Sequence, residues 1–146
     1  MKKNQEFGSL ILRVILGFTF FMHGLDKFQG GVENFAAGFP SMGLPSILAY
    51  FVAFIELVGG ISLILGIGTR IFSGLIACIM IGAIVLVKVR DGFLGGYEFD
   101  VVLMIIALHL VLNGSYLLSV DSKLLQLKSA SSRKAHEESP VNERTS

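Results

Sequence analysis

The sequence predicts an all-α membrane protein, a four-transmembrane-helix bundle with a short interfacial helix in its first loop. Hydrophobic residues make up 53% of the 146 residues and charged residues only 16%, so the chain is more apolar and less charged than an ordinary soluble domain. Four apolar segments approach the roughly 20 residues that a helix needs to cross a bilayer. Because backbone groups in lipid must bond within their own segment, each is expected to be a helix.

The four apolar segments cover residues 7–27, 47–67, 71–89 and 101–118. A short glycine-containing turn joins the second and third, which are therefore expected to form an antiparallel hairpin. The first loop is longer, and in it Val32, Phe35, Phe39 and Met42 recur every three or four residues. This spacing predicts a short helix with one apolar face, lying in the membrane interface. The glycine-rich residues 90–100 predict a compact turn.

The two ends of the chain have different compositions. Lys2 and Lys3 precede the first apolar segment, but no small-residue cleavage site follows it, so the segment is expected to be a retained anchor. Residues 120–128 predict a short surface helix. Residues 129–146 are mainly Ser, Lys, Arg and Glu and are predicted to be disordered. The expected division is a four-helix transmembrane domain, 1–128, and a disordered cytoplasmic tail, 129–146.

The distribution of charge predicts the orientation. Nine of the 12 lysines and arginines lie in the N-terminal segment, the second loop and the C-terminal tail. The positive-inside rule then places both termini in the cytoplasm of a multi-pass protein in a bacterial-type plasma membrane. The lipid bilayer is the expected partner, and a net charge of +1 argues against nucleic acid. The single cysteine, Cys78, excludes a disulfide within the chain, and no Cys/His pattern predicts a metal site.

Glu56 is the clearest candidate for a functional residue. It lies near the middle of the second segment, where a charged side chain costs about 2.5–3.5 kcal/mol and usually faces a partner inside the bundle. It could accept a proton or bind the polar head of a ligand. It could equally form a structural ion pair, or be a neutral acid that ties helices together.

His23 and His109 are the next candidates. Counted from the outer ends of their segments, His23 lies about 6 Å deep and His109 about 12 Å deep. A hydrogen bond from Glu56 to either histidine is therefore expected to be possible, and histidine beside a carboxyl suits proton transfer with a quinone. The difference in depth argues against a shared haem iron. Each histidine could instead bond a backbone carbonyl.

Further polar and small residues surround these candidates. Arg13, one turn inside the first segment, could extend to the interface or reach towards Glu56. Gly59 and Gly60, one turn after Glu56, would let a neighbouring helix or a flat ligand approach that carboxyl. Glu98 precedes the fourth segment and is expected to cap it.

Six short motifs follow one another along the chain: LRVILG at 12–17, HGLDK at 23–27, FIELVGG at 54–60, LGIGTR at 65–70, GYE at 96–98 and LSVD at 118–121. Together their order and spacing resemble the DoxX family of small membrane proteins, over about residues 10–123. The resemblance implies a four-helix membrane protein without settled catalytic residues. Its recurrent polar positions correspond to Arg13, His23, Lys27, Glu56, Arg70 and Glu98.

Members of this family are similar to a subunit of a thiosulfate:quinone oxidoreductase, and others are linked to quinone, catechol or thiol stress. The resemblance therefore implies a membrane component of a redox system, a quinone-linked oxidoreductase subunit. Together with the depth argument, it suggests Glu56, His23 and His109 as catalytic residues. The suggested binding residues are Arg13, Lys27, Gly59, Gly60 and Glu98.

No haem, flavin or iron–sulfur site is visible in the sequence, so a soluble or membrane redox enzyme is the expected electron donor, and quinone is the candidate cofactor. Two alternatives stay open. One is a non-catalytic membrane scaffold that recruits soluble redox enzymes. The other is a small-molecule transporter, which with four helices would require a homo-oligomer. The sequence does not decide whether the chain is catalytic by itself.

Overall fold

The computed structural model describes residues 2–137, and within them it contains helices and no strand. The elements are α1 Lys2–Gln29, α2 Val32–Ala36, η1 Pro40–Met42, α3 Ile47–Leu65, α4 Thr69–Gly82, η2 Ala83–Lys88, η3 Val89–Asp91, η4 Phe93–Tyr97, α5 Glu98–Asn113 and α6 Val120–Glu137. The all-α prediction is confirmed.

Four helical stretches are long and apolar enough to cross a membrane: Asn4–Gln29, Ile47–Leu65, Thr69–Asp91 and Phe93–Asn113. They confirm the four predicted segments, but the fourth ends earlier than residue 118. Gly114 adopts φ 68° and ψ −169°, which ends the helix after Asn113 although Leu117 and Leu118 prolong the apolar pattern. Because the fourth helix ends at Asn113 and not at residue 118, His109 lies closer to the end of its helix than the sequence predicted.

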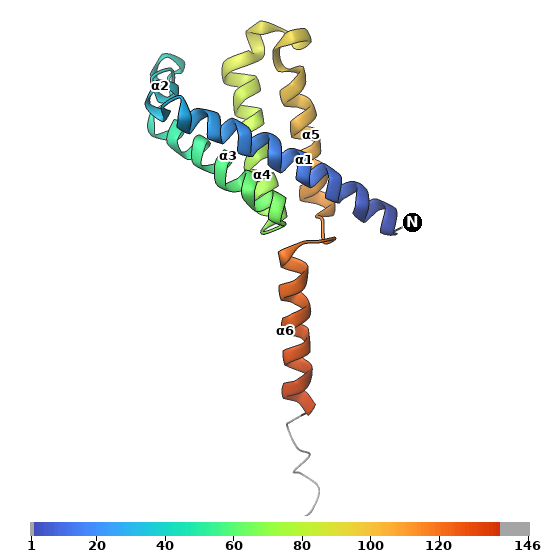
Figure 1. Ribbon diagram of the computed structural model, residues 1–146. Helices are drawn as coiled ribbons and strands as arrows, with labels where there is room; N and C mark the ends of the chain where they lie inside the picture. Colours follow the sequence, from blue (N-terminus) through green and yellow to red (C-terminus); the bar gives the residue numbers. More distant parts are fainter. Residues whose placement is uncertain (1, 138–146) are drawn as a thin grey trace, which may run out of the picture.

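The four stretches pack as two antiparallel pairs, α1 with α3 and α4 with α5, and the first pair crosses the second (Figure 1). We call the side with the α3–α4 turn, the start of α1 and the end of α5 the turn side, and the opposite side the loop side. The cytoplasmic location of the turn side rests on the charge distribution and stays a prediction. Helix α6 projects away from the bundle on the turn side (Figure 1).

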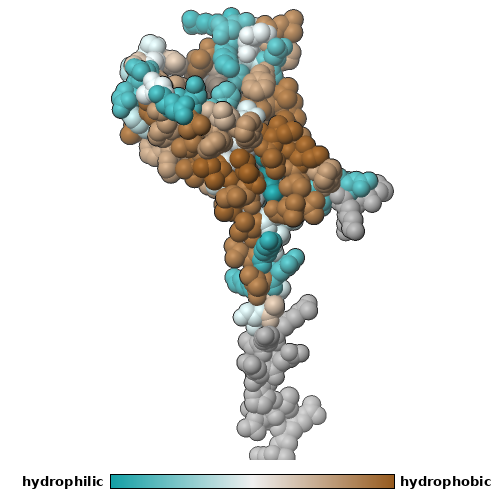
Figure 2. Space-filling model, viewed as in Figure 1, coloured by the Kyte–Doolittle hydropathy of each residue, from teal (hydrophilic) through white to brown (hydrophobic). Residues whose placement is uncertain are grey.

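On the face shown in Figure 2, hydrophobic residues cover the middle of the bundle, and hydrophilic residues gather at its loop-side end and around α6. Many large apolar side chains of the bundle are exposed. Phe18, Phe51, Phe54 and Ile105, for example, are 57–58% exposed. Such a surface is suited to lipid. The buried core lies where the two pairs cross and contains Leu16, Phe20, Leu63, Ile76, Ala77, Met80, Leu103, Ala107 and Leu110.

Glycines let the backbones of α1 and α3 touch. A Cβ atom on Gly60 would lie 2.4 Å from the backbone nitrogen of Phe21, and one on Gly24 would lie 2.5 Å from the backbone nitrogen of Leu57. A Cβ on Gly17 would lie 2.8 Å from the carbonyl oxygen of Gly60. No larger residue fits at these positions without separating the helices. The contact therefore fixes the register of α1 along α3.

The first loop contains the predicted short helix as α2, Val32–Ala36, which covers only the first part of the apolar stripe. Helix α2 ends at Ala36, and a separate 3₁₀ turn begins at Pro40, because proline cannot donate a helical hydrogen bond. The predicted apolar stripe is split accordingly, since Val32 is buried whereas Met42 is 38% exposed.

The C-terminal helix is longer than predicted. Helix α6 continues past Ser129 to Glu137, and its Leu, Lys, Gln and Ala residues have high helix propensity. The expectation of disorder from residue 129 is therefore wrong for this stretch of the structure. Residues 138–146, the rest of the predicted disordered tail, lie outside the described residues, and the division into domains stays a prediction.

Substituting Gly60→Ala should weaken the bundle by about 1–3 kcal/mol, because the new methyl group overlaps the α1 backbone. Unfolding in detergent micelles by a denaturant measures the change. Gly82→Ala is the matched control: a Cβ there meets nothing within 4 Å, so stability should stay unchanged or rise slightly. Equal destabilisation by the two variants would contradict the close α1–α3 contact.

Candidate functional site

Glu56 forms an ion pair with Lys27. The Lys27 ammonium donates to Oε2 of Glu56 and lies 4.9 Å from the centroid of the Phe35 ring. The Lys27 side chain is 18% exposed and the Glu56 side chain 5%. The register set by the glycine contact brings the last turn of α1 to this part of α3. A buried carboxylate with a direct cationic partner favours the structural ion pair, one of the roles that the sequence left open.

Neither His23 nor His109 bonds Glu56 in the described part of the chain, so the predicted Glu56–histidine hydrogen bond is not formed. His23 lies on an exposed face of α1, with its ring centroid 6.3 Å from that of Phe20. His109 instead contacts Ser9, near the start of α1. Since α5 ends at Asn113, His109 is one turn from the turn side and not at mid-membrane.

The two histidines are also too far apart to bind one haem iron. Ser9 and His23 are separated by about 21 Å along α1 at 1.5 Å per residue, and His109 Nε2 lies 3.2 Å from the Ser9 hydroxyl. The two histidines therefore lie near opposite ends of α1, farther apart than their predicted depths, and cannot share an iron. No group of three or more His, Cys, Asp or Glu residues in the described part of the chain is placed to bind a metal ion.

A groove of about 450 Å³ lies between α1 and α5 beside His109, and we call it the Ser9–His109 groove. Its lining residues are Gln5, Glu6, Gly8, Ser9, Leu12, His109, Asn113 and Gly114. Ser9, one of the lining residues, is only 6% exposed. The groove is thus a concave site that combines hydrogen-bonding groups with apolar walls, as ligand sites commonly do.

The two ring nitrogens of His109 face different partners. Asn113 Nδ2 lies 3.2 Å from Nδ1, and Ser9 Oγ lies 3.2 Å from Nε2. The tautomer of the ring sets which atom donates in each contact. In the tautomer with the proton on Nε2, the ring donates to Ser9 Oγ and accepts from Asn113, and the Ser9 hydroxyl proton is available to a ligand in the groove.

Arg13 neither extends to the interface nor reaches Glu56, which corrects both predicted positions. Its guanidinium, in a residue 1% exposed, donates through Nη1 to the Ser115 carbonyl at 3.0 Å and through Nη2 to the Leu118 carbonyl at 3.2 Å. Arg13 therefore holds the segment that follows α5 against the inside of the bundle.

The segment after α5 is tied down at further points. Ser119 Oγ donates to the Gly66 carbonyl at 2.6 Å, and the Gly68 backbone N–H donates to Asp121 Oδ2 at 2.8 Å. Glu6 Oε2 accepts from the backbone N–H groups of Tyr116 and Leu117, both at 3.2 Å. The sequence predicts a helix start at residues 119–121, and α6 begins at Val120. The bonds of Ser119 and Asp121 to the distant α3–α4 turn could not be predicted, because their partners are backbone groups.

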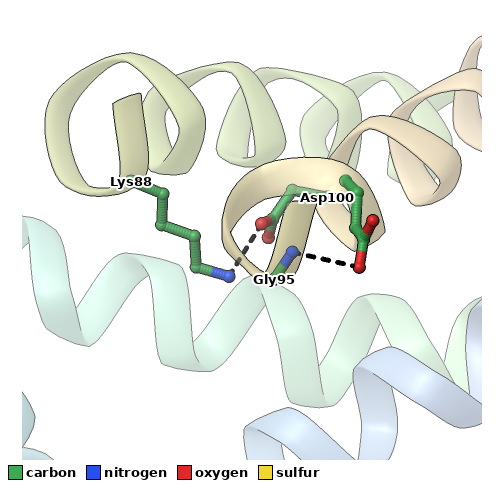
Figure 3. A network of polar contacts seen from close by, with 4 residues as sticks. Lys88, Gly95 and Asp100 are labelled. Atoms are coloured by element: carbon green, nitrogen blue, oxygen red, sulfur yellow. Dashed lines mark hydrogen bonds and ion pairs between the residues drawn. The ribbon is translucent and has the colours of Figure 1, made fainter. Parts of the chain in front are cut away.

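A second lysine–carboxylate pair joins the end of η2 to the first turn of α5 on the loop side. Lys88 donates to Asp100 Oδ2 at 2.7 Å, and Asp100 is buried (Figure 3). The Gly95 backbone N–H donates to Glu98 Oε1 at 3.3 Å in the same region. Glu98 and Asp100 both lie in the first turn of α5, where negative charge is favourable to the helix dipole, but the predicted capping by Glu98 is wrong: Tyr97 is at the N-cap, and no side chain of the described residues caps the helix.

Comparison with known proteins assigns the family. The family model described as DoxX matches residues 8–89. A protein of Bacillus subtilis (strain 168) named "Putative oxidoreductase CatD" is 49% identical over 121 residues, which cover 83% of this chain and 90% of that protein. The chain belongs to the DoxX family. No solved structure matches it.

Five of the six DoxX motifs, all except that at 96–98, gather at two places in the structure. Those around residues 23–27 and 54–60 form the Lys27–Glu56 pair and the close α1–α3 contact. Those around residues 12–17, 65–70 and 118–121 meet where Arg13 binds the segment after α5. The α1 backbone occupies the space beside Gly60, and a Cβ on Gly59 would lie 3.2 Å from Phe72. Both glycines therefore pack helices together and leave no room for a flat ligand.

If the Lys27–Glu56 pair is structural, Glu56→Gln should destabilise the protein by about 3 kcal/mol, because it leaves the lysine charge without a partner. The double variant Lys27→Gln/Glu56→Gln should recover most of this loss, since two amides can still hydrogen-bond. Denaturant unfolding of all three variants in micelles measures the coupling. Losses that simply add in the double variant would refute the pairing.

Arg13→Lys should destabilise the protein by about 2 kcal/mol, because one ammonium group cannot reach both carbonyls that the guanidinium fork binds. Arg70→Lys is the matched control, since Arg70 is exposed and donates only to the Leu112 carbonyl. Its effect should stay within about 0.5 kcal/mol. Protease cleavage between residues 114 and 119 should accelerate in the Arg13 variant alone, and equal acceleration in both would contradict the assignment.

Proposed function

We propose that the chain is a membrane component of a redox system that binds a quinone-type molecule in the Ser9–His109 groove, with electrons supplied by a partner redox enzyme. Membership of the DoxX family and the oxidoreductase name of the Bacillus subtilis relative support a redox role. We choose this site because the groove combines open volume with the Ser9 hydroxyl, which His109 orients.

The groove has the features that a quinone head group requires. Its volume of about 450 Å³ lies within the range of roughly 300–1,000 Å³ typical of small-molecule sites. Leu12 and Gly8 offer apolar contact to a ring, and the buried Ser9 hydroxyl offers a hydrogen bond to a ring carbonyl. The groove lies among the first turns of α1, so a lipid-soluble molecule can enter it near the membrane boundary.

Reduction of a quinone places negative charge on its oxygens, and two electrons and two protons yield the quinol. In this proposal the Ser9 O–H stabilises the developing charge, and His109 Nε2–H, held in place by Asn113, orients the hydroxyl. Water at the membrane boundary provides the protons. Glu56 is not part of this chemistry, because its carboxylate is paired with Lys27 on the other side of the core.

The proposal predicts that Ser9→Ala and His109→Gln weaken binding of a short-chain benzoquinone by about threefold to tenfold, the worth of one hydrogen bond. Binding is measured by titration of the purified full-length protein in lipid nanodiscs. The same variants should reduce protection of cells challenged with catechol or benzoquinone.

Two controls match the variants in chemistry. His23→Gln removes a histidine from the exposed face of α1, and Ser41→Ala removes an exposed serine from the loop side. Neither should alter binding. Unchanged quinone affinity and full protection in both groove variants would refute the proposal. A stoichiometric redox enzyme that co-purifies without any quinone binding would instead support the non-catalytic scaffold.

A further inference from the structure

The first turns of α6 carry apolar side chains that the bundle leaves exposed. Val120, Leu124 and Leu127 are spaced by four and three residues, which places them on one face of the helix. Leu124 is 59% and Leu127 68% exposed, and α6 projects away from the four crossing helices (Figure 1). We call these three residues the α6 apolar strip. Water is an unfavourable environment for such a strip.

Hydrogen bonds hold the start of α6 at the membrane boundary. Helices α3 and α4 both belong to membrane-crossing stretches, so the turn that joins them lies at the edge of the hydrocarbon. The Gly66 carbonyl of this turn accepts from Ser119 Oγ at 2.6 Å, and the Gly68 backbone N–H donates to Asp121 Oδ2 at 2.8 Å. The α6 apolar strip, which begins between Ser119 and Asp121, therefore starts beside the lipid headgroups.

Lysines border the strip on both edges. Lys128 follows Leu124 by four residues and Lys123 precedes Leu127 by four, so each lysine is the neighbour of one leucine, on opposite sides of the strip. Both lysines are exposed. Helix α6 contains four lysines and arginines against two acidic residues, of which Asp121 is bound to the α3–α4 turn. An apolar face edged with cations is typical of a helix that lies on an anionic membrane surface.

The length of the strip distinguishes the membrane surface from other partners. Val120 and Leu127 are about 10 Å apart along the helix at 1.5 Å per residue, whereas the headgroup layer on each side of a bilayer is about 5–8 Å thick. A helix that stands upright would therefore carry Leu127 through this layer into water. A coiled coil with a second copy would need three or more apolar heptads, but the next positions of the strip are Ser131 and Lys134.

We propose that α6 binds anionic phospholipids of the surrounding bilayer. The helix turns about its tied start, from the position in Figure 1 onto the turn-side leaflet, so that the α6 apolar strip reaches the acyl chains. Lys123 and Lys128 then extend to the lipid phosphates. Arg70, exposed two residues after Gly68 at the start of α4, adds a third cation beside the same turn. This surface is separate from the Ser9–His109 groove and independent of quinone binding.

Spin labels on two faces of α6 test its orientation in the full-length protein. Leu127→Cys carries the label on the strip, and Ser129→Cys carries it about 160° around the helix. Both are made with Cys78→Ser, because Cys78 is exposed. In nanodiscs that contain phosphatidylglycerol, oxygen dissolved in the acyl chains should reach the label at 127, and a water-soluble nickel chelate should reach the label at 129. In nanodiscs of phosphatidylcholine alone, the chelate should reach both labels.

Removal of the lysine charges tests the preference for anionic lipid. One lysine near an anionic surface strengthens binding about fivefold. Lys123→Gln/Lys128→Gln should therefore lower the ratio of docked to undocked α6 about thirtyfold, measured from the two components in the spectrum of the label at 127. Arg90→Gln is the matched control, because it removes an exposed cation from the loop side, and it should leave the ratio unchanged.

Equal access of the chelate to both labels in phosphatidylglycerol nanodiscs would overturn the proposal. Equal protection of the label at 127 with and without phosphatidylglycerol would overturn it as well, because the lysines would then contribute nothing. Spectral broadening from coupling between the 127 labels of two chains would replace lipid with a second copy as the partner. If Leu127→Cys does not fold, Leu124→Cys carries the label on the same face and is judged by the same criteria.

Discussion

The contact between the backbones of α1 and α3 determines where the polar groups of this protein meet. Gly17, Gly24 and Gly60 allow an approach that any side chain would prevent, and the contact fixes one register. At the loop side that register brings Lys27 to Glu56. At the turn side it brings Arg13 against Gly66, from where the guanidinium reaches the carbonyls after α5. Both polar connections follow from a packing constraint.

Lipid makes these connections necessary. An ionisable side chain inside the hydrocarbon must find a partner within the protein, and each buried charge described here has one or, in the case of Arg13, several. The interior is therefore occupied by pairs whose main effect is to hold helices together. One place in the described part of the chain that offers both open volume and hydrogen-bonding groups is at the rim, where α1 and α5 leave the Ser9–His109 groove between them. Chemistry at the rim can exchange ligands with lipid and protons with water.

The four helices could be predicted from the sequence because the bilayer imposes a length and a composition on each crossing. The ends of the helices could not be predicted as well. Leu117 and Leu118 prolong the apolar pattern of the fourth crossing, but Gly114 ends the helix, and His109 consequently lies a turn from the membrane boundary. Lys27 was the end of a predicted segment, and only the register of α1 on α3 shows that it reaches Glu56. Arg13 binds backbone carbonyls, which leave no signal in a sequence.

The central claim is that the ligand of this protein binds beside His109. Nitrogen-15 NMR of histidine-labelled protein in nanodiscs tests it most directly, because the ring nitrogens of His109 and His23 report separately once each is assigned by substitution. Our account predicts that a short-chain benzoquinone shifts the His109 resonances, which without ligand show the proton on Nε2, and leaves those of His23 unchanged. A shift confined to His23, or no shift at either histidine at saturating quinone, would contradict it.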